Sequence, residues 1–230
     1  MRPVDRGAPP PLAFSKYQAA APLLINKIGC YCSYCERQIE THLAVEHIQP
    51  KSFNPNLLLD WNNFLLGCVH CNSSKGDTSV NLDDFLWPDT DNTMLGFQYH
   101  VGGLVFPSSA LPNLIEKKAR AMIVLVGLDK DPGNPDNSRL PSKSDQRWLH
   151  RKETWEKAQK AKRDLQRSDS NTVREWIVET AISRGGFSIW FTVLGDDEDM
   201  RLRLINAFIG TATNCFDQNG LCIHRPGGMI

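Results

Sequence analysis

Two pairs of closely spaced cysteines constrain this sequence more than any other feature. Each pair has the form C-x2-C, Cys32 with Cys35 and Cys68 with Cys71, and 32 residues separate the inner two. Two such pairs can supply the four thiolates of a tetrahedral zinc site, although the gap between them is wider than in common zinc ribbons. Because protein side chains fill all four positions, we expect this zinc to be structural.

The other cysteines have less specific spacing. Cys30 lies two residues before Cys32 and offers an alternative ligand, but C-x-C is the rarer knuckle, and a small buried thiol is the simpler interpretation. Cys215 and Cys222, with His224, offer either a second metal site or the apolar packing typical of isolated cysteines. The odd total of seven cysteines favours metal binding in a reducing compartment over a disulfide framework.

The composition is that of an ordinary soluble protein. The 230 residues are 41% apolar, enough for one large domain or two small ones. Basic and acidic residues number 26 each, so bulk charge does not indicate nucleic-acid binding. Residues 143–174 are nevertheless rich in Lys and Arg and form either a phosphate-contacting face or a solvated helix surface. Without a membrane-length apolar run or a signal-peptide core, we expect a cytoplasmic protein.

The first 80 residues predict a small module that begins with a helix. That helix should cover residues 19–28, with a break or kink near Pro22. Alternating apolar residues predict a strand over 43–47, and the return strand is expected over 61–66. One helix should follow the second cysteine pair, so the module is a hairpin followed by a helix.

Beyond residue 80 the pattern is larger and mainly helical. The sequence predicts a strand pair over 97–106 and helices over 113–126, 144–167 and 200–208. Another helix should begin at a capping box formed by Thr172-x-x-Glu175. The apolar stretch 187–194 fits a buried strand or a buried helix, and its periodicity does not decide between them.

The insert between the cysteine pairs carries side chains that a purely structural zinc module does not need. Glu46 and His47 are adjacent, and Asn72 follows the last cysteine. A neutral imidazole titrates close to working pH, so His47 is the candidate general base. Glu46 and Asn72 offer the oxygen atoms that Mg²⁺ or Mn²⁺ prefers. Because successive strand residues face opposite sides, Glu46 and His47 can share a site only where the strand ends or bulges.

Two asparagines and a lysine have predicted supporting roles. The amide of Asn63 can bridge backbone groups and hold the loop that carries His47. Asn72 should lie near a helix N-terminus, where free backbone N–H groups favour a phosphate, and Lys75 is expected to contact that phosphate. Base, cation ligands and phosphate contacts together favour phosphodiester hydrolysis.

This ordered set resembles the HNH, or ββα-metal, endonuclease family over about residues 30–77. Glu46-His47 is similar to the first element of the family's motif, Asn63 to its middle Asn, and Asn72 to the last position in its H-N-N form. The resemblance implies that His47 activates water, that one cation held by Glu46 and Asn72 stabilises the leaving 3′-oxygen, and that the product carries a 5′-phosphate. Glu46 replaces the commoner Asp and Asn72 replaces His, and both provide oxygen ligands.

A narrower resemblance covers nearly the whole chain. Its blocks are Met1-Arg2-Pro3-Val4-x-Arg6-Gly7, Tyr31-Cys32-Ser33-Tyr34-Cys35-Glu36-Arg37, Trp61-Asn62-Asn63-Phe64-Leu65-Leu66-Gly67-Cys68 and Arg225-Pro226-Gly227-Gly228. They are similar to the HNH nuclease subunits of Septu and retron-associated anti-phage systems, the PtuB-like family. This resemblance implies a partner, an ABC-type ATPase of the PtuA kind, and degradation of nucleic acid when infection is sensed.

These inferences combine into one expectation with two alternatives. The fold should be α+β, with a helix and a zinc-stabilised ββα-metal module in residues 1–80 and a mainly helical region in 81–230 for partner or substrate contact. The function should be metal-dependent cleavage of DNA, or of a structured RNA such as tRNA. The alternatives are a zinc-stabilised nucleic-acid-binding adaptor without catalysis and a stand-alone restriction-type nuclease.

Overall fold

The computed structural model describes residues 1–11, 13–41 and 43–230. Its fold is the mixed helix and strand type that the sequence predicts, with two small antiparallel sheets of two strands each among the described residues. The strands are β1 Ala44–His47, β2 Phe64–Gly67, β3 Phe97–His100 and β4 Leu104–Pro107. The α-helices are α1 Ala21–Ile28, α2 Val69–Lys75, α3 Thr93–Gly96, α4 Asn113–Leu125, α5 Arg147–Arg167, α6 Asn171–Arg184, α7 Phe187–Val193 and α8 Glu198–Ala207.

The hairpin and helix predicted for the first module are present as β1, β2 and α2. β1 and β2 pair antiparallel with His47 opposite Phe64. The return strand is shorter than the predicted 61–66, because residues 61–63 form a 3-10 turn, η3. The side chain of Asp60 accepts a hydrogen bond from the Asn62 backbone N–H at 2.9 Å and so caps this turn.

The helix predicted with a break near Pro22 changes type there: a 3-10 turn, η1 Tyr17–Ala20, is followed by α1, and Pro22 lies in the first turn of α1, where its missing N–H leaves no hydrogen bond unmade. A second prediction about a helix start is wrong. α6 is capped by Ser170, whose hydroxyl accepts the Val173 N–H at 3.3 Å, so Thr172 lies inside the helix and the predicted capping box does not form.

The remaining elements agree with the sequence pattern. β3 and β4 form the predicted strand pair, and α4, α5 and α8 lie within a few residues of the predicted helices. The apolar stretch that allowed a strand or a helix is the buried helix α7. The polar residues Ser188 and Thr192 are compatible with this buried helix. The Thr192 hydroxyl is satisfied within it, because it donates to the Ser188 carbonyl at 2.7 Å.

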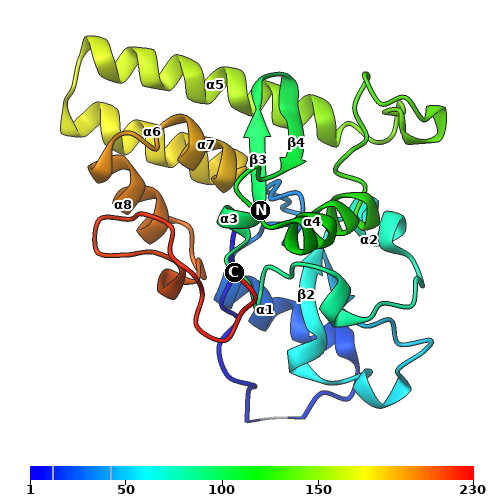
Figure 1. The fold of residues 1–230 in the computed structure, drawn as a ribbon. Coiled ribbons are helices and arrows are strands. Elements are labelled where there is room, and N and C mark those ends of the chain that lie inside the picture. Colours follow the sequence, from blue (N-terminus) through cyan, green and yellow to red (C-terminus); the bar gives the residue numbers. More distant parts are fainter. Residues whose placement is uncertain (12, 42) are drawn as a thin grey trace.

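The ends of the chain meet in the middle of the molecule, between the ββα unit and the helices (Figure 1). The side chain of Thr93 donates to the Met1 carbonyl at 2.7 Å, and the Asn92 N–H donates to the Ile230 carbonyl at 2.9 Å. The Arg2 guanidinium is buried and reaches the carbonyls of Ile28 and Ile209.

The long helix α5 lies along the upper edge of the molecule, above α6 and α7, and the tip of the β3–β4 hairpin packs against it (Figure 1). One hydrophobic cluster includes residues from both sides of residue 80, and the division into 1–80 and 81–230 stays a prediction. In the part of the chain that the structure describes, no helix combines the length and apolar character needed to cross a membrane.

Candidate functional site

The four predicted zinc ligands converge. The Sγ atoms of Cys32, Cys35, Cys68 and Cys71 all lie within 4.8 Å of one another, and the four side chains are buried. Cys35 Sγ and Cys68 Sγ are 3.8 Å apart, close to the separation that two Zn–S bonds of about 2.3 Å produce at a tetrahedral centre. The cluster therefore fits a structural zinc ion, and Cys30 is not part of it.

Hydrogen bonds to sulfur support the same assignment. The backbone N–H of Cys68 points to Cys32 Sγ at 3.3 Å, that of Cys71 to Cys68 Sγ at 3.4 Å, and Arg147 Nη1 lies 3.0 Å from Cys71 Sγ. Burial raises the pKa of the Cys32 and Cys71 thiols well above the ordinary value, so a bound cation is needed to hold them as thiolates. Arg147 comes from the start of α5, and the sequence pattern contained no signal for it.

The C-terminal cysteines do not form a comparable group. Within the described ranges, the only set of three or more potential metal ligands is the four-cysteine cluster, so Cys215, Cys222 and His224 are not gathered into a second site. Burial raises the pKa of the Cys215 thiol to about 11. Burial raises the pKa of the Cys222 thiol to about 12, so both cysteines behave as packed, protonated thiols.

The ββα unit places Glu46, His47 and Asn72 around one small cavity of about 100 Å³. β1 ends at His47. Neighbouring strand residues can serve one site where a strand ends, so Glu46 and His47 can both line this cavity. Asn72 projects from α2, and its side-chain amide makes no hydrogen bond to the described residues. The structure thus brings the predicted base and both predicted cation ligands together.

His47 is held in one tautomer. Its Nε2 lies 3.0 Å from the Leu58 carbonyl, and since a carbonyl only accepts, the proton of the neutral ring is on Nε2 and Nδ1 is left as a base. The ring packs edge-on against Tyr17 and Phe64, with centroid distances of 4.8 and 5.2 Å. Burial lowers the pKa of His47 below its ordinary value, and nearby Lys51 adds to this effect, so the ring is neutral at pH 7.

Glu46 is paired with Lys75 inside the protein. Lys75 Nζ lies 2.9 Å from Glu46 Oε1 and 2.7 Å from the His47 carbonyl, and the lysine side chain is 1% exposed. Burial raises the pKa of Glu46 above its ordinary value, and the Lys75 ammonium opposes this rise. That Lys75 contacts a phosphate stays a prediction. In the structure its ammonium contacts the Glu46 carboxylate and the His47 carbonyl, both in β1.

A second carboxylate that the sequence reasoning missed lines the same cavity. Asp77 is exposed just after α2, and its negative charge adds to the raised pKa of Glu46. Asp77 follows Lys75-Gly76, where the helix ends, and an acidic residue in a polar turn carries no specific sequence signal. With Glu46 and Asn72 it completes a set of oxygen donors that suits a hard divalent cation.

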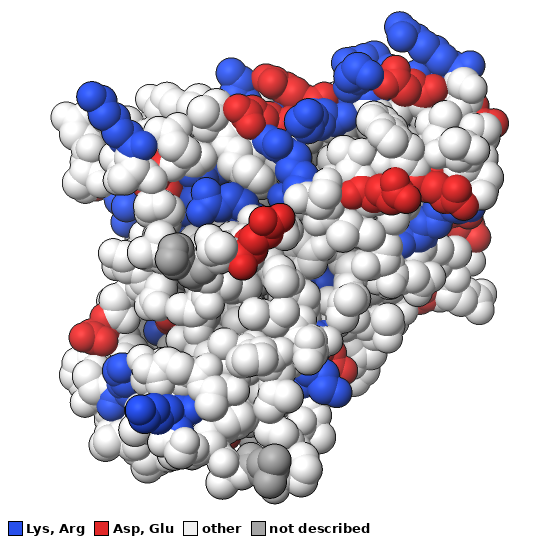
Figure 2. Space-filling model, turned by 180° about the vertical axis from the view of Figure 1, so that it is seen from behind, with Lys and Arg blue, Asp and Glu red and all other residues white. Residues whose placement is uncertain are grey.

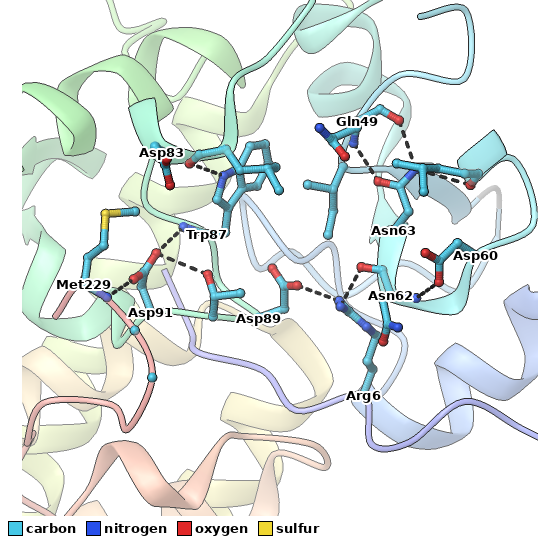
Figure 3. A pocket seen from close by; sticks show the side chains of 16 residues that line it. Arg6, Gln49, Asp60, Asn62, Asn63, Asp83, Trp87, Asp89, Asp91 and Met229 are labelled. Carbon is cyan, nitrogen blue, oxygen red and sulfur yellow. Dashed lines mark hydrogen bonds and ion pairs between the residues drawn. The ribbon is translucent and has the colours of Figure 1, made fainter. Parts of the chain in front are cut away.

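Asn63 clamps the loop that follows His47. Its Oδ1 accepts the Gln49 N–H at 2.7 Å, and its Nδ2 donates to the Gln49 carbonyl at 2.9 Å. Figure 3 shows this clamp beside a cavity of about 570 Å³, whose lining also includes Arg6 paired with Asp89 at 2.7 Å. Asn63 thus occupies the loop-holding position that the sequence predicted.

Comparison with known proteins agrees with this geometry. Residues 32–78 match the family model described as HNH endonuclease. The chain is also similar to the Septu protein PtuB from Bacillus thuringiensis, with 33% identity over 78 residues. That match covers 31% of this chain and 30% of the relative, so it spans about a third of either protein.

The family match, the ββα arrangement and the convergent side chains describe the same stretch of sequence. β1, β2 and α2 all lie within residues 32–78, and so do the four cysteines and the three residues around the cavity. The predicted resemblance is therefore confirmed where the comparisons reach: residues 32–78 match the HNH endonuclease family model, and 31% of the chain is similar to PtuB. The resemblance of the remaining blocks stays a prediction.

Proposed function

We propose that this chain is the nuclease subunit of a Septu-like anti-phage system and hydrolyses phosphodiester bonds of nucleic acid, DNA in the first place and tRNA or other RNA as a variant. One observation carries the proposal: a base, a carboxylate and an amide line one cavity at the end of β1, inside the HNH domain. The similarity to a Septu protein supports the defence context.

His47 performs the proton transfer in this proposal. Its Nδ1 takes a proton from a water molecule in the cavity, and the water oxygen forms a bond to phosphorus as the bond from phosphorus to the 3′-oxygen breaks. The departing 3′-oxygen takes up a proton from solvent, so the products are a 5′-phosphate and a 3′-hydroxyl. The Leu58 carbonyl and the Tyr17 and Phe64 rings keep the imidazole oriented for this transfer.

Glu46, Asn72 and Asp77 would hold the catalytic cation. Mg²⁺ or Mn²⁺, when bound, supplies positive charge for the oxygen that leaves. Lys75 keeps the buried Glu46 carboxylate ionised and fixed in direction, and it holds the backbone at His47 through the 2.7 Å hydrogen bond. The zinc cluster positions α2, and with it Asn72, because Cys68 and Cys71 lie at the start of that helix.

The proposal includes a protein partner. The chain carries no net charge, with 26 basic and 26 acidic residues, so its own attraction for nucleic acid should be modest. An ABC-type ATPase of the PtuA kind, implied by the resemblance to Septu and retron-associated systems, would present the substrate or license cleavage. Strong, salt-sensitive binding of DNA by the isolated chain would contradict this part of the proposal.

The test compares His47→Ala with a matched histidine variant. Wild type, His47→Ala and His70→Ala are incubated with plasmid DNA and with total tRNA, with Mn²⁺ present or omitted, and with or without the candidate ATPase. Loss of the base should lower cleavage by about 10²–10⁴-fold, whereas His70, which lies on α2 outside the cavity, should be dispensable.

The outcomes separate the competing functions. Cleavage that needs Mn²⁺ and His47 supports the nuclease, and the substrate that disappears identifies DNA or RNA. Full activity without the ATPase would favour a stand-alone restriction-type nuclease. If zinc-loaded wild type and His47→Ala behave alike in every condition, the adaptor function replaces the proposal.

A further inference from the structure

Away from the HNH cavity, basic side chains surround a hollow of about 400 Å³. α5 contributes His150 and Lys157, and α6 contributes Arg184. Arg37 reaches it from the segment just after the first cysteine pair. The hydroxyl-bearing residues Thr180 and Ser183 complete the wall, and none of the described residues that line it is acidic. The volume is within the range of ligand pockets, about 300–1,000 Å³.

A close backbone contact holds Arg37 beside α6. Arg37 and Gly185 form an antiparallel bridge, and the Gly186 N–H donates to the Glu36 carbonyl at 2.9 Å. A Cβ on Gly185 would lie 2.3 Å from the Glu36 carbonyl oxygen, so only glycine permits this approach. The position of Arg37 next to the end of α6 is therefore built into the fold.

The positive charges around the hollow are incompletely paired. The Nε of Arg37 is buried and has no hydrogen-bond partner in the described part of the chain. Arg184 donates through Nε to Thr154 at 2.9 Å and through Nη2 to Glu153 at 2.6 Å, which leaves Nη1 unengaged among the described residues. Glu153 is itself 50% exposed. The Nε of Arg37 is too buried to meet a ligand in the hollow, whereas Nη1 of Arg184 and the exposed ammonium of Lys157 have no acceptor among the described residues and can pair with an anion.

His150 reports the same excess of positive charge. Burial lowers the pKa of His150 to about 4, the charges of Arg184, Arg37 and Arg151 lower it further, and Glu153 opposes them. The imidazole is therefore neutral at pH 7. A neutral histidine can still share a hydrogen bond with a bound anion.

We propose that this hollow binds a phosphate group of a phosphate-bearing ligand. Guanidinium groups and an ammonium recognise phosphate oxygens, and here they converge from two helices and the segment after the first cysteine pair. The Thr180 and Ser183 hydroxyls donate to backbone carbonyls of α6, so the charged groups carry the recognition. On the rear face of the molecule, Figure 2 shows most Lys and Arg side chains in the upper half, with Asp and Glu side chains among them. This site is separate from the HNH cavity, and the inference does not rest on the proposed nuclease function.

Two ligand sources share this chemistry, the backbone of a nucleic acid and a free nucleotide. Binding to a short DNA duplex, to AMP and to inorganic phosphate is measured by calorimetry with the full chain and no added divalent cation, so cleavage plays no part. The test variant is Lys157→Gln. The matched control is Lys160→Gln, on the same helix, where the lysine pairs with Asp164 outside the hollow.

Lys157→Gln should weaken binding of the recognised probe about tenfold, and Lys160→Gln should change it little. Binding of DNA without AMP identifies a backbone contact, whose salt dependence should fall by about one ion in Lys157→Gln. Binding of AMP or phosphate identifies a free anion. In either case, the bound anion should raise the pKa of His150 above its value of about 4. A pH titration of the His150 imidazole NMR signals measures this change.

The inference is overturned if wild type binds none of the three probes, or if Lys157→Gln and Lys160→Gln bind them equally. Arg37→Gln provides a second variant at the buried donor. Lys157 is exposed on α5, so Lys157→Gln should fold normally. It therefore tests the inference even if Arg37→Gln does not fold.

Discussion

The HNH cavity and the basic hollow use charge in opposite ways. In the HNH cavity, the buried Lys75 ammonium is neutralised by Glu46 at 2.9 Å, so the site is balanced before any ligand arrives. In the hollow, Arg184 pairs with the half-exposed Glu153, and Arg37 and Lys157 form no ion pair with the described residues. A paired, buried charge holds catalytic groups in place, whereas unpaired charge at a surface attracts a ligand.

Residues 32–72, which include the four zinc ligands, connect these two regions. Cys35 contributes to the metal cluster, and Arg37, two residues later, lines the hollow. On the other side, Cys71 immediately precedes Asn72 of the HNH cavity. The comparison can therefore be tested first at the zinc cluster, which both regions share, and then within each region.

The largest effect should follow loss of a zinc ligand. Structural zinc contributes roughly 10 kcal/mol or more to folding of small zinc modules, so Cys68→Ser should lose the metal, unfold residues 32–78 and abolish cleavage. Zinc content per chain and thermal unfolding measure this. Cys30→Ser is the matched control, because Cys30 lies outside the cluster and should leave zinc content unchanged. Retention of stoichiometric zinc by Cys68→Ser would disprove the ligand assignment.

Replacing Lys75 should be far more damaging than replacing Lys157. Lys75→Met leaves the Glu46 carboxylate buried without a counter-charge, which should cost about 3–5 kcal/mol of unfolding free energy. Lys157→Met, at an exposed position, should change it by less than about 0.5 kcal/mol. Urea unfolding of both variants measures the difference.

The Lys75→Met loss should also depend on pH. The pKa of Glu46 is already raised in the folded protein, and removal of Lys75 raises it further. A carboxyl group whose folded pKa is raised destabilises the fold as pH rises through that pKa, because the unfolded chain releases the proton more easily. The loss should therefore shrink on acidification, and Glu46→Gln in the same chain should recover part of it. An equal loss at all pH values would contradict the buried ion pair.

Breaking the Asn63 clamp should have an intermediate effect. Asn63→Ala removes both hydrogen bonds to the Gln49 backbone and leaves those groups unsatisfied, at a cost of about 1–3 kcal/mol. Cleavage should fall as well, because the loop that orients His47 loosens. Asn62→Ala is the matched neighbour, since its exposed side chain makes no hydrogen bond to the described residues. Equal unfolding temperatures for the two variants would contradict the assignment of Asn63 as the residue that holds this loop.

The smallest effect concerns the pH dependence of cleavage. Nδ1 of His47 must be unprotonated to act as a base, so activity should fall as pH drops through the lowered pKa of His47. The positive charge of Lys51 contributes to that lowering, and Lys51→Gln should therefore shift the acid limb to higher pH. Rate profiles at saturating Mn²⁺ measure the shift. A shift to lower pH would show that Lys51 does not act on the imidazole by its charge.

Local spacing predicted the elements whose residues are close in sequence. The cysteine pairs converge as expected, the β3–β4 hairpin turns at its two glycines, and α4 and α5 lie near their predicted ranges. Errors arose where a competing local interaction was present. Ser170 caps α6 in place of Thr172, and Asp60 nucleates a 3-10 turn that shortens the return strand.

For the site, residue type and order were sufficient to identify Glu46, His47, Asn63 and Asn72 as candidates, and their catalytic roles stay predictions. The sequence could not show that the Leu58 carbonyl sets the tautomer of His47, because any backbone carbonyl can do this. It also could not show that Lys75 turns inward, since a lysine near a helix end is usually solvated.

What the sequence determined by itself is the chemistry of residues 32–78: four thiolates, an imidazole and oxygen donors in the order of the HNH family. What only the tertiary structure decided is which charges meet. Lys75 and Glu46 pair across the ββα unit, and a backbone bridge between Arg37 and Gly185 places the Arg37 charge beside Arg184 at the end of α6. Ligand spacing is a local property of the chain, but the pairing of buried charges depends on contacts between segments distant in sequence, which no local pattern encodes.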